Sequence, residues 1–154
     1  MQITPEAKKH VLRNLVELYR HDLSIFDDAM PDDSGRFGTD PYFDCYWTDT
    51  DRHPFTVLIN GKVAGFALVR ELGPDCYSIA EFFIVRSCRK RGAGRAVAHQ
   101  LFRMFPGEWH IAQQELNLPA QHFWRRIIDE FSQGDYEEQW SNKQPRGPKQ
   151  IFRS

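Results

Sequence analysis

The sequence is short of the features that would place it in a specialised class of protein. It has only three cysteines, Cys45, Cys76 and Cys88, which show no metal-ligand spacing and cannot all pair with one another. We therefore expect reduced thiols, no bound metal and a cytoplasmic protein. No apolar run approaches the length of a membrane span, and the N-terminus lacks the apolar core of a signal peptide, so no membrane association is expected.

A surplus of charge is also missing. The net charge of -1 argues against a general nucleic-acid-binding protein, which usually has an overall basic surplus. Hydrophobic residues make up 41% of the chain and charged residues 27%, a balance typical of globular proteins. Because neither a linker nor an internal repeat interrupts the sequence, residues 1–154 are expected to form one domain.

What the sequence does contain is a clear order of helices and strands. A first helix is expected over residues 4–20, with Thr4 as N-cap and Pro5 at the first helical position. Two β-rich runs flank Asn60-Gly61, the preferred pair for a two-residue hairpin turn, and a third strand is expected over residues 76–86. The later expected elements are a helix from Gly94 that stops at Pro106, a strand at 108–115, a helix at 118–131, and strands at 136–141 and 149–153.

This order predicts a central mixed sheet with helices on its faces. The connection from the strand at Phe82 to the strand at Trp109 is a β-α-β unit, so these two strands should be parallel neighbours. Residues 21–54 are rich in Asp, Gly, Pro and aromatics and are expected to form a long loop, with a short helix in its first part. We interpret its aromatic residues as a cover over a ligand cleft, with a solvated acidic loop as the alternative; they are Tyr42, Phe43, Tyr46 and Trp47.

The turn that follows the third strand is strongly basic. Its charged residues are Arg86, Arg89, Lys90, Arg91 and Arg95. Gly92 and Gly94 lie among them, at the start of a helix, where backbone N–H groups lack partners and the helix dipole is positive. This arrangement predicts a phosphate site, and the alternative is a solvated turn that needs Gly92 only for its backbone angles. A Walker loop is excluded because no Gly-Lys-Ser/Thr follows, and a dinucleotide fingerprint is disfavoured by Val97 at its third glycine position.

Two motifs carry a family resemblance. The stretch "RKRGAG", Arg89 to Gly94, matches the Arg/Gln-x-x-Gly-x-Gly/Ala signature of the GCN5-related N-acetyltransferase (GNAT) superfamily, and "NLPAQHFW", from Asn117, resembles its second motif. With the order of the elements, the resemblance covers nearly the whole chain. It implies the GNAT fold, an α/β (α+β) architecture with a mixed, mostly antiparallel sheet and helices on both faces, and it implies acetyl-CoA as the acetyl donor.

The resemblance also implies positions for the cofactor. The pyrophosphate would lie on the backbone N–H groups of residues 91–95, with neighbouring Arg and Lys side chains offsetting its charge. Pantetheine would pair with the backbone of residues 83–85, and the Val85 N–H would polarise the thioester carbonyl. Asn117 would bind pantetheine, cap the next helix, or do both. The full set of expected cofactor-binding residues is Phe83, Ile84, Val85, Arg89, Lys90, Arg91, Gly92, Ala93, Gly94, Arg95, Asn117 and Trp124.

The family's reaction is direct attack of an amine on the thioester, which needs a proton acceptor and a proton for the thiolate. Glu81 shares a strand face with Phe83 and Val85, so it can act as the base, directly or through water, or instead pair with an arginine. Trp124 stands where many family members have a Tyr as general acid. Water, Tyr136 or Tyr77 can fill that role, the thiolate can leave unassisted, or Trp124 can simply pack in the core.

The function that the resemblance implies is acetyl-CoA-dependent transfer to a primary amine of a small molecule or peptide. The Asp-rich loop suits a cationic acceptor; its carboxylates are Asp32, Asp33, Asp40, Asp44, Asp49 and Asp51. The alternatives are a catalytically impaired CoA-binding or regulatory module of the same fold and a phosphate site for another nucleotide. The acceptor's identity and the oligomeric state stay open, including a homodimer formed through the terminal strands.

Overall fold

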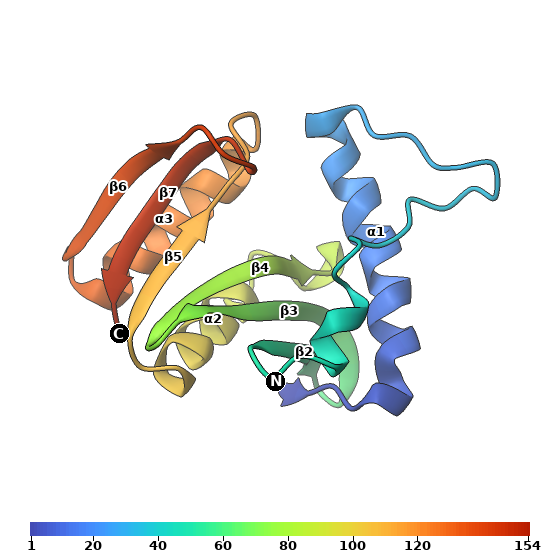
Figure 1. The fold of residues 1–154 in the computed structure, drawn as a ribbon, viewed down its shortest axis with the longest axis horizontal. Helices are drawn as coiled ribbons and strands as arrows, with labels where there is room; N and C mark the ends of the chain where they lie inside the picture. The colour runs from blue at the N-terminus through green and yellow to red at the C-terminus, as the bar shows by residue number, and fades with distance from the viewer. The chain divides into compact units, whose positions relative to one another are not determined.

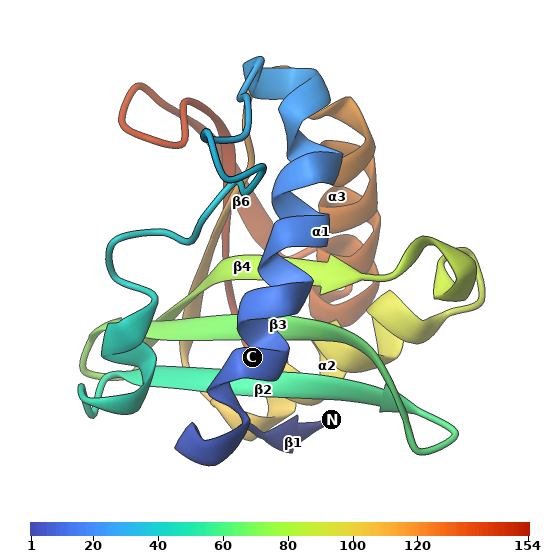
Figure 2. The same cartoon turned by 90° about the vertical axis from the view of Figure 1, so that its right-hand side faces the viewer.

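The computed structural model describes all of residues 1–154 and has seven strands and three α-helices (Figures 1 and 2). The strands are β1 (Gln2–Ile3), β2 (Arg52–Ile59), β3 (Lys62–Gly73), β4 (Cys76–Ile84), β5 (Glu108–Ala112), β6 (Tyr136–Ser141) and β7 (Gly147–Arg153). The helices are α1 (Lys9–Asp27), α2 (Ala93–Met104) and α3 (Leu118–Ser132), with short 3-10 turns η1 (Glu6–Lys8), η2 (Asp44–Trp47) and η3 (Arg86–Cys88).

The strands form one sheet in the order β1-β2-β3-β4-β5-β7-β6. Strand β4 pairs with β5 in parallel, as the β-α-β unit predicts, whereas β1 with β2, β5 with β7 and β6 with β7 are antiparallel. The turn residues Asn60 and Gly61 both have positive φ, 51° and 75°, the conformation that a two-residue hairpin turn requires. The prediction of a mixed, mostly antiparallel sheet with helices is confirmed.

Contacts divide the chain into two compact units. The first unit consists of Met1–Val69 and Glu81–Cys88, and the second consists of Arg70–Ala80 and Arg89–Ser154. Strands β3 and β4 each contribute residues to both units.

The core of the first unit forms under α1, which crosses β2 and β3 in Figure 2. The helix buries Leu12, Leu15 and Val16, the apolar stripe that repeats every three to four residues. This stripe packs with Phe66 of β3 and Phe83 of β4. The core also includes two aromatic residues of the expected loop, Phe43 and Tyr46.

The start of the chain differs from its prediction. Thr4 does not cap a helix: its hydroxyl lies 2.7 Å from that of Thr56, in the buried contact of β1 with β2, and its N–H donates to the Pro54 carbonyl. The first helical turn after Pro5 is the 3-10 turn η1, and α1 starts only at Lys9 and continues to Asp27. A two-residue edge strand has no detectable hydrophobic period, so the sequence did not predict β1, and Thr4 directly after it was interpreted as a helix cap.

The second unit is built around aromatic side chains between the sheet and its two helices. The Phe102 ring of α2 lies 5.1 Å from Trp109, 5.1 Å from Phe131 and 4.8 Å from Phe152, measured between centroids and close to edge-to-face in each case. Helix α3 contributes the fully buried Ile127 and contacts β6 and β7. Its expected boundaries are confirmed by Pro119 in the first turn and a left-handed residue just after Ser132.

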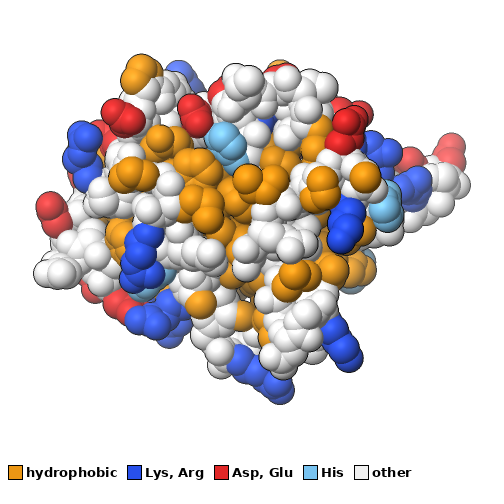
Figure 3. Space-filling model, turned by 90° about the horizontal axis from the view of Figure 1, so that it is seen from below, with side chains coloured by type: hydrophobic (Ala, Val, Ile, Leu, Met, Phe, Trp, Pro, Cys, Tyr) orange, Lys and Arg blue, Asp and Glu red, His pale blue; other side chains and the backbone are white.

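The molecular surface carries charges of both signs. On the face drawn in Figure 3, Lys and Arg side chains are interspersed with Asp and Glu and with patches of apolar side chains. None of the helices combines the length and the apolar character that crossing a bilayer would require.

Candidate functional site

The glycine turn before α2 forms the most distinctive backbone feature of the second unit. Gly92 has φ 81° and directly precedes the helix, and no side chain caps the helix N-terminus. The first helical bond runs from the Ala96 N–H to the Gly92 carbonyl at 3.0 Å, so the N–H groups of residues 93–95 lie ahead of it. A Cβ at Gly92 would meet no atom within 4 Å. This corner therefore has both features expected of a phosphate site, free N–H groups and open space above the glycine.

The basic side chains of residues 86–95 have different partners. The Arg95 guanidinium donates from Nε to both carboxylate oxygens of Glu130 at 2.7 and 2.8 Å, and this pair lowers the pKa of Glu130. Arg86, in the first unit, donates from Nε to Asp22 of α1 at 2.9 Å. The exposed side chains of Lys90 and Arg91 are in no ion pair. The charge available to an anion thus comes mainly from Lys90 and Arg91, and the Arg95 side chain is committed elsewhere.

The end of β4, in the first unit, is held tightly against β3. The Val85 N–H donates to the Ala64 carbonyl at 2.8 Å. Gly65 follows Ala64, and a Cβ there would overlap the Phe83 carbonyl oxygen. Phe83 and Ile84 are both buried. The expected oxyanion role of the Val85 N–H does not fit this bond, because a donor already paired inside the sheet is not available to a thioester carbonyl.

Glu81 lies two residues before Phe83 and faces α1. The Tyr19 hydroxyl acts on this carboxylate and opposes the rise in its pKa, and the Tyr19 ring lies 6.0 Å from that of Phe83 between centroids. Burial raises the pKa of Glu81 to about 7, with a further increase from Asp40 and opposing effects from Tyr19 and Arg20. The same burial, together with the nearby Glu81 charge, raises the pKa of Tyr19 well above its usual range. The shared face of Glu81, Phe83 and Val85 is confirmed, since Phe83 and Val85 belong to the same apolar cluster as Tyr19.

A carboxyl group with a pKa near 7 exchanges its proton at neutral pH, which is the property of a general base. The sequence suggested Glu81 but not Tyr19. The tyrosine falls on the apolar stripe of α1, and helical spacing does not distinguish a core aromatic from one whose hydroxyl lies beside a carboxylate.

The loop between α1 and β2 is more firmly anchored than expected. Glu17 of α1 accepts hydrogen bonds from the N–H groups of Phe37 and Gly38 at 2.7 and 3.1 Å. Asp44 pairs with Lys9 at 2.9 Å and with Arg13 at 3.1 Å. These acidic groups therefore hold the loop itself, and Asp40 is the loop carboxylate whose charge acts on Glu81.

The expected aromatic cover over a cleft is wrong for most of its residues. Phe43 and Tyr46 are only 2% and 5% exposed and pack in the core of the first unit. Trp47 is half-buried and donates from Nε1 to the Thr4 carbonyl at 2.9 Å. Tyr42 alone is exposed, at 59%. These residues lie in the predicted loop, but the apolar side of η2 completes the core of the first unit and does not cover a cleft.

The second motif, in the second unit, has a structural role at both of its key positions. The Asn117 side chain accepts a hydrogen bond from the Ala120 N–H at 3.1 Å and so caps α3. Trp124 is 6% exposed, and its ring lies 4.9 Å from that of Phe123 between centroids. The capping and core-packing interpretations of these residues thus both hold. Of the two tyrosines considered as alternative acids, Tyr77 packs its ring against Phe105 and Trp109, and Tyr136 lies at the start of β6.

Comparison with known proteins decides the family. The model of the acetyltransferase (GNAT) family matches residues 15–128. The chain belongs to this family. The match begins in α1 and ends in α3, so it includes Glu81 and the glycine corner at Gly92.

Solved structures share the GNAT fold at low identity. An acetyltransferase from Thermus thermophilus superposes with a TM-score of 0.74 at 12% identity, covering 99% of this chain and 94% of that one. A GNAT-family acetyltransferase from Staphylococcus aureus gives 0.68 at 10% identity, covering 99% and 96%. The aminoglycoside acetyltransferase AAC(6')-Ib in complex with coenzyme A gives 0.68 at 15% identity, covering 99% and 92%. No curated protein sequence is significantly similar to this chain.

Proposed function

We propose that residues 1–154 act as one GNAT domain that transfers the acetyl group of acetyl-CoA to a primary amine of a small molecule or peptide. The amine nitrogen attacks the thioester carbonyl carbon, the carbon–sulfur bond breaks, and coenzyme A leaves as a thiolate. One observation carries the catalytic part of the proposal. Glu81 is a half-buried carboxyl group whose pKa is raised to about 7.

In this reaction Glu81 accepts a proton from the acceptor ammonium, directly or through water. An amine is nucleophilic only when deprotonated, and a base with a pKa near the working pH is both sufficiently ionised and sufficiently basic. The Tyr19 hydroxyl stabilises the charged form of this carboxylate. The negative charge of Asp40 adds to the attraction for a cationic acceptor. The proton for the thiolate comes from water, because Trp124 has no acidic group to supply it.

Donor binding is proposed at the glycine corner. The N–H groups of residues 93–95 and the side chains of Lys90 and Arg91 would hold the pyrophosphate, with Arg89 adding charge. The backbone of residues 83–85 would contribute less to pantetheine binding than the resemblance implies, because the Val85 N–H is already paired with Ala64. Structures of AAC(6')-Ib hold coenzyme A or acetyl-CoA, some with the amines ribostamycin or kanamycin, which supports a small-molecule acceptor.

A catalytically impaired CoA-binding module is the second candidate. The buried Trp124 at a position where many family members have a Tyr favours it, as does the occupied Val85 N–H. Both features bear on turnover, and neither affects the glycine corner. Acetyl transfer and acetyl-CoA binding therefore have to be measured separately.

For transfer, release of the coenzyme A thiol is followed with a panel of aminoglycosides, polyamines, amino acids and peptides. We expect kcat/KM for the best amine to rise through about pH 7 in the wild type. Glu81→Gln should lower it on the order of 100-fold near neutral pH and less at high pH, where free amine is abundant. Glu6→Gln, an exposed carboxylate on η1, is the matched control. Binding of acetyl-CoA with no transfer to any amine would favour the non-catalytic module instead.

For binding, acetyl-CoA affinity is measured by calorimetry in Arg91→Glu and in the control Lys143→Glu, an exposed charge reversal in the β6–β7 loop of the same unit. Arg91→Glu should weaken binding at least about tenfold, because a like charge replaces an attractive one beside the pyrophosphate. Lys143→Glu should leave it unchanged. Equal affinities in the two folded variants would remove the glycine corner from the donor site.

A further inference from the structure

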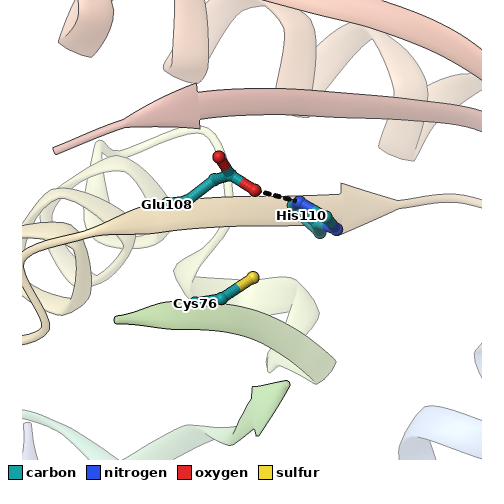
Figure 4. Close-up of side chains that lie close together, drawn as sticks. All are labelled: Cys76, Glu108 and His110. Atoms are coloured by element: carbon teal, nitrogen blue, oxygen red, sulfur yellow. Dashed lines mark hydrogen bonds and ion pairs between the residues drawn. The ribbon is translucent and has the colours of Figure 1, made fainter. Parts of the chain in front are cut away.

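Three side chains with metal-binding donors converge where β4 begins to pair with β5. The Cys76 sulfur, a Glu108 carboxylate oxygen and a His110 ring nitrogen all lie within 4.8 Å of one another (Figure 4). All three residues belong to the second unit and are half-buried. None of them takes part in the proposed acetyl transfer.

The strand register explains the convergence. In the parallel ladder Cys76 is opposite Glu108, and Ser78 is opposite His110. Paired residues point to the same face of a sheet, and residues two apart on a strand share a face, so all three side chains project together. Trp109, between the two β5 donors, points the other way and is fully buried. The common direction of the three side chains is therefore set by the pairing of the two strands.

Strand β5 is also held on both sides at this point. The Glu108 N–H donates to the Asp75 carbonyl at 2.8 Å, and the Ser154 N–H donates to the Gly107 carbonyl at 2.9 Å. A Cβ at Gly107 would overlap the Asp75 carbonyl oxygen, which shows how closely the two backbones approach. Donors mounted on paired strands keep their spacing better than donors on loops.

The chemistry of the donor set favours zinc. A thiolate and an imidazole are poor ligands for Mg²⁺ and Ca²⁺, which prefer oxygen, whereas sulfur, nitrogen and carboxylate ligands are all common for Zn²⁺. A thiolate and a carboxylate together balance the two charges of the ion. His110 Nε2 now lies 2.8 Å from Glu108 Oε1, at hydrogen-bond distance. Ligand atoms around tetrahedral zinc are about 3.3–3.8 Å apart, so small side-chain rotations suffice.

We propose that Cys76, Glu108 and His110 bind one zinc ion, with water at the fourth tetrahedral position. The ion would cross-link β4 to β5 at the start of their parallel ladder and stabilise that pairing. The expectation of no metal rested on the spacing of the cysteines alone. It did not consider ligands from two separate segments, which the sheet brings together.

The test uses cobalt as a spectroscopic substitute for zinc in the full chain. Wild-type protein should bind one equivalent of Co²⁺ with a sulfur-to-cobalt charge-transfer band and the intense d–d bands of a tetrahedral site, and Zn²⁺ should displace it. Cys76→Ser should abolish the charge-transfer band, whereas Cys88→Ser, at another free cysteine, should retain it. Glu108→Gln and His110→Asn should weaken Zn²⁺ binding at least about tenfold, but His122→Ala, on the exposed side of α3, should not.

A second measurement needs no variant. Zinc should protect Cys76 from alkylation in wild-type protein while leaving Cys88 as reactive as before, and it should raise the unfolding temperature. A cobalt thiolate band that persists in Cys76→Ser, a stoichiometry other than one, or unchanged Cys76 alkylation in the presence of Zn²⁺ would each overturn the proposal.

Discussion

At the scale of single residues, Glu81 and Tyr19 form the pair on which the proposed chemistry depends. Burial favours the protonated form of Glu81, while the Tyr19 hydroxyl stabilises the carboxylate, and the resulting pKa is about 7. The tyrosine therefore limits how far burial can raise the pKa. This balance can be tested by removing one hydroxyl group.

Tyr19→Phe is expected to raise the pKa of Glu81 further, since the variant keeps the burial and loses the hydroxyl that stabilises the charged form. The pH midpoint of kcat/KM, or of the Glu81 carboxyl signal in an NMR titration, should move upward by about one unit. Tyr42→Phe, whose ring is exposed, should leave the midpoint where it is. A midpoint that stays the same or falls in Tyr19→Phe would show that the two side chains are not coupled.

Only part of the site could be predicted at this scale. The alternation of strand side chains predicted the direction of Glu81, and the motif predicted the glycine corner. Which basic residues are already paired was not predictable, because Asp22 and Glu130, the partners of Arg86 and Arg95, lie far from them in the chain. The same holds for Val85, since the pairing of its N–H depends on how closely β3 approaches β4.

At the scale of elements, strong local sequence patterns predicted the secondary structure correctly. The packing of loop residues into the core was not predicted. The Asn60-Gly61 hairpin, the β-α-β unit and the boundaries of α3 follow from turn chemistry and helical period, and all are confirmed. The aromatic residues of the loop were misassigned because a loop that completes a core has the same composition as one that covers a cleft. Only the packing of Phe43 and Tyr46 against α1 separates the two cases.

The close approach of β3 to β4 leads to a prediction for glycine variants of β3. In Gly65→Ala the new Cβ would overlap the Phe83 carbonyl oxygen, and neither backbone can yield without separating the strands. We expect a loss of about 3 kcal/mol in the free energy of unfolding, measured with urea. Gly73→Ala lies at the other end of the same strand, where a Cβ meets no atom within 4 Å, and should be nearly neutral. Similar stabilities of the two variants would contradict this account.

At the scale of the whole molecule, the titrating groups predict how stability depends on pH. Glu138 accepts hydrogen bonds from Arg125 and Gln150, which lower its pKa, and Arg95 does the same for Glu130. Groups with a lowered pKa stabilise the fold above their ordinary value of 4.5, and this contribution is lost as the pH falls. Glu81 acts in the opposite sense. Its raised pKa makes the folded state less stable as the pH rises from 4.5 to about 7.

The free energy of unfolding should therefore be highest at about pH 5 and lower by about 1–3 kcal/mol near pH 8. Because the Glu81 side chain is partly exposed, the loss of stability is smaller than full burial of its carboxylate would cause. Urea unfolding across the pH range measures the effect. Glu81→Gln should remove the decline above pH 5 and keep the loss at acid pH; a wild type equally stable at both values would be evidence against the raised pKa.

Much of the molecule as a whole was predictable, because two motifs at the right spacing in the right order of elements identify the GNAT fold. The acceptor, the oligomeric state and a cytoplasmic location stay predictions or open questions. The donor cluster of Cys76, Glu108 and His110 could not be found from spacing, since its members come together only through the strand register.

The ends of the strand order have a consequence for aggregation. An edge strand offers unpaired backbone groups to other chains, and long, flat apolar edges promote fibrils. Here one edge, β1, is two residues long, and the other, β6, exposes the carboxylate of Glu137, whereas that of Glu138 is paired with Arg125. A second copy adding at β1 would meet too little backbone, and one adding at β6 would meet the charge of Glu137. Uncontrolled growth of the sheet is thereby discouraged at both margins, so the folded protein should withstand high concentration without forming amyloid.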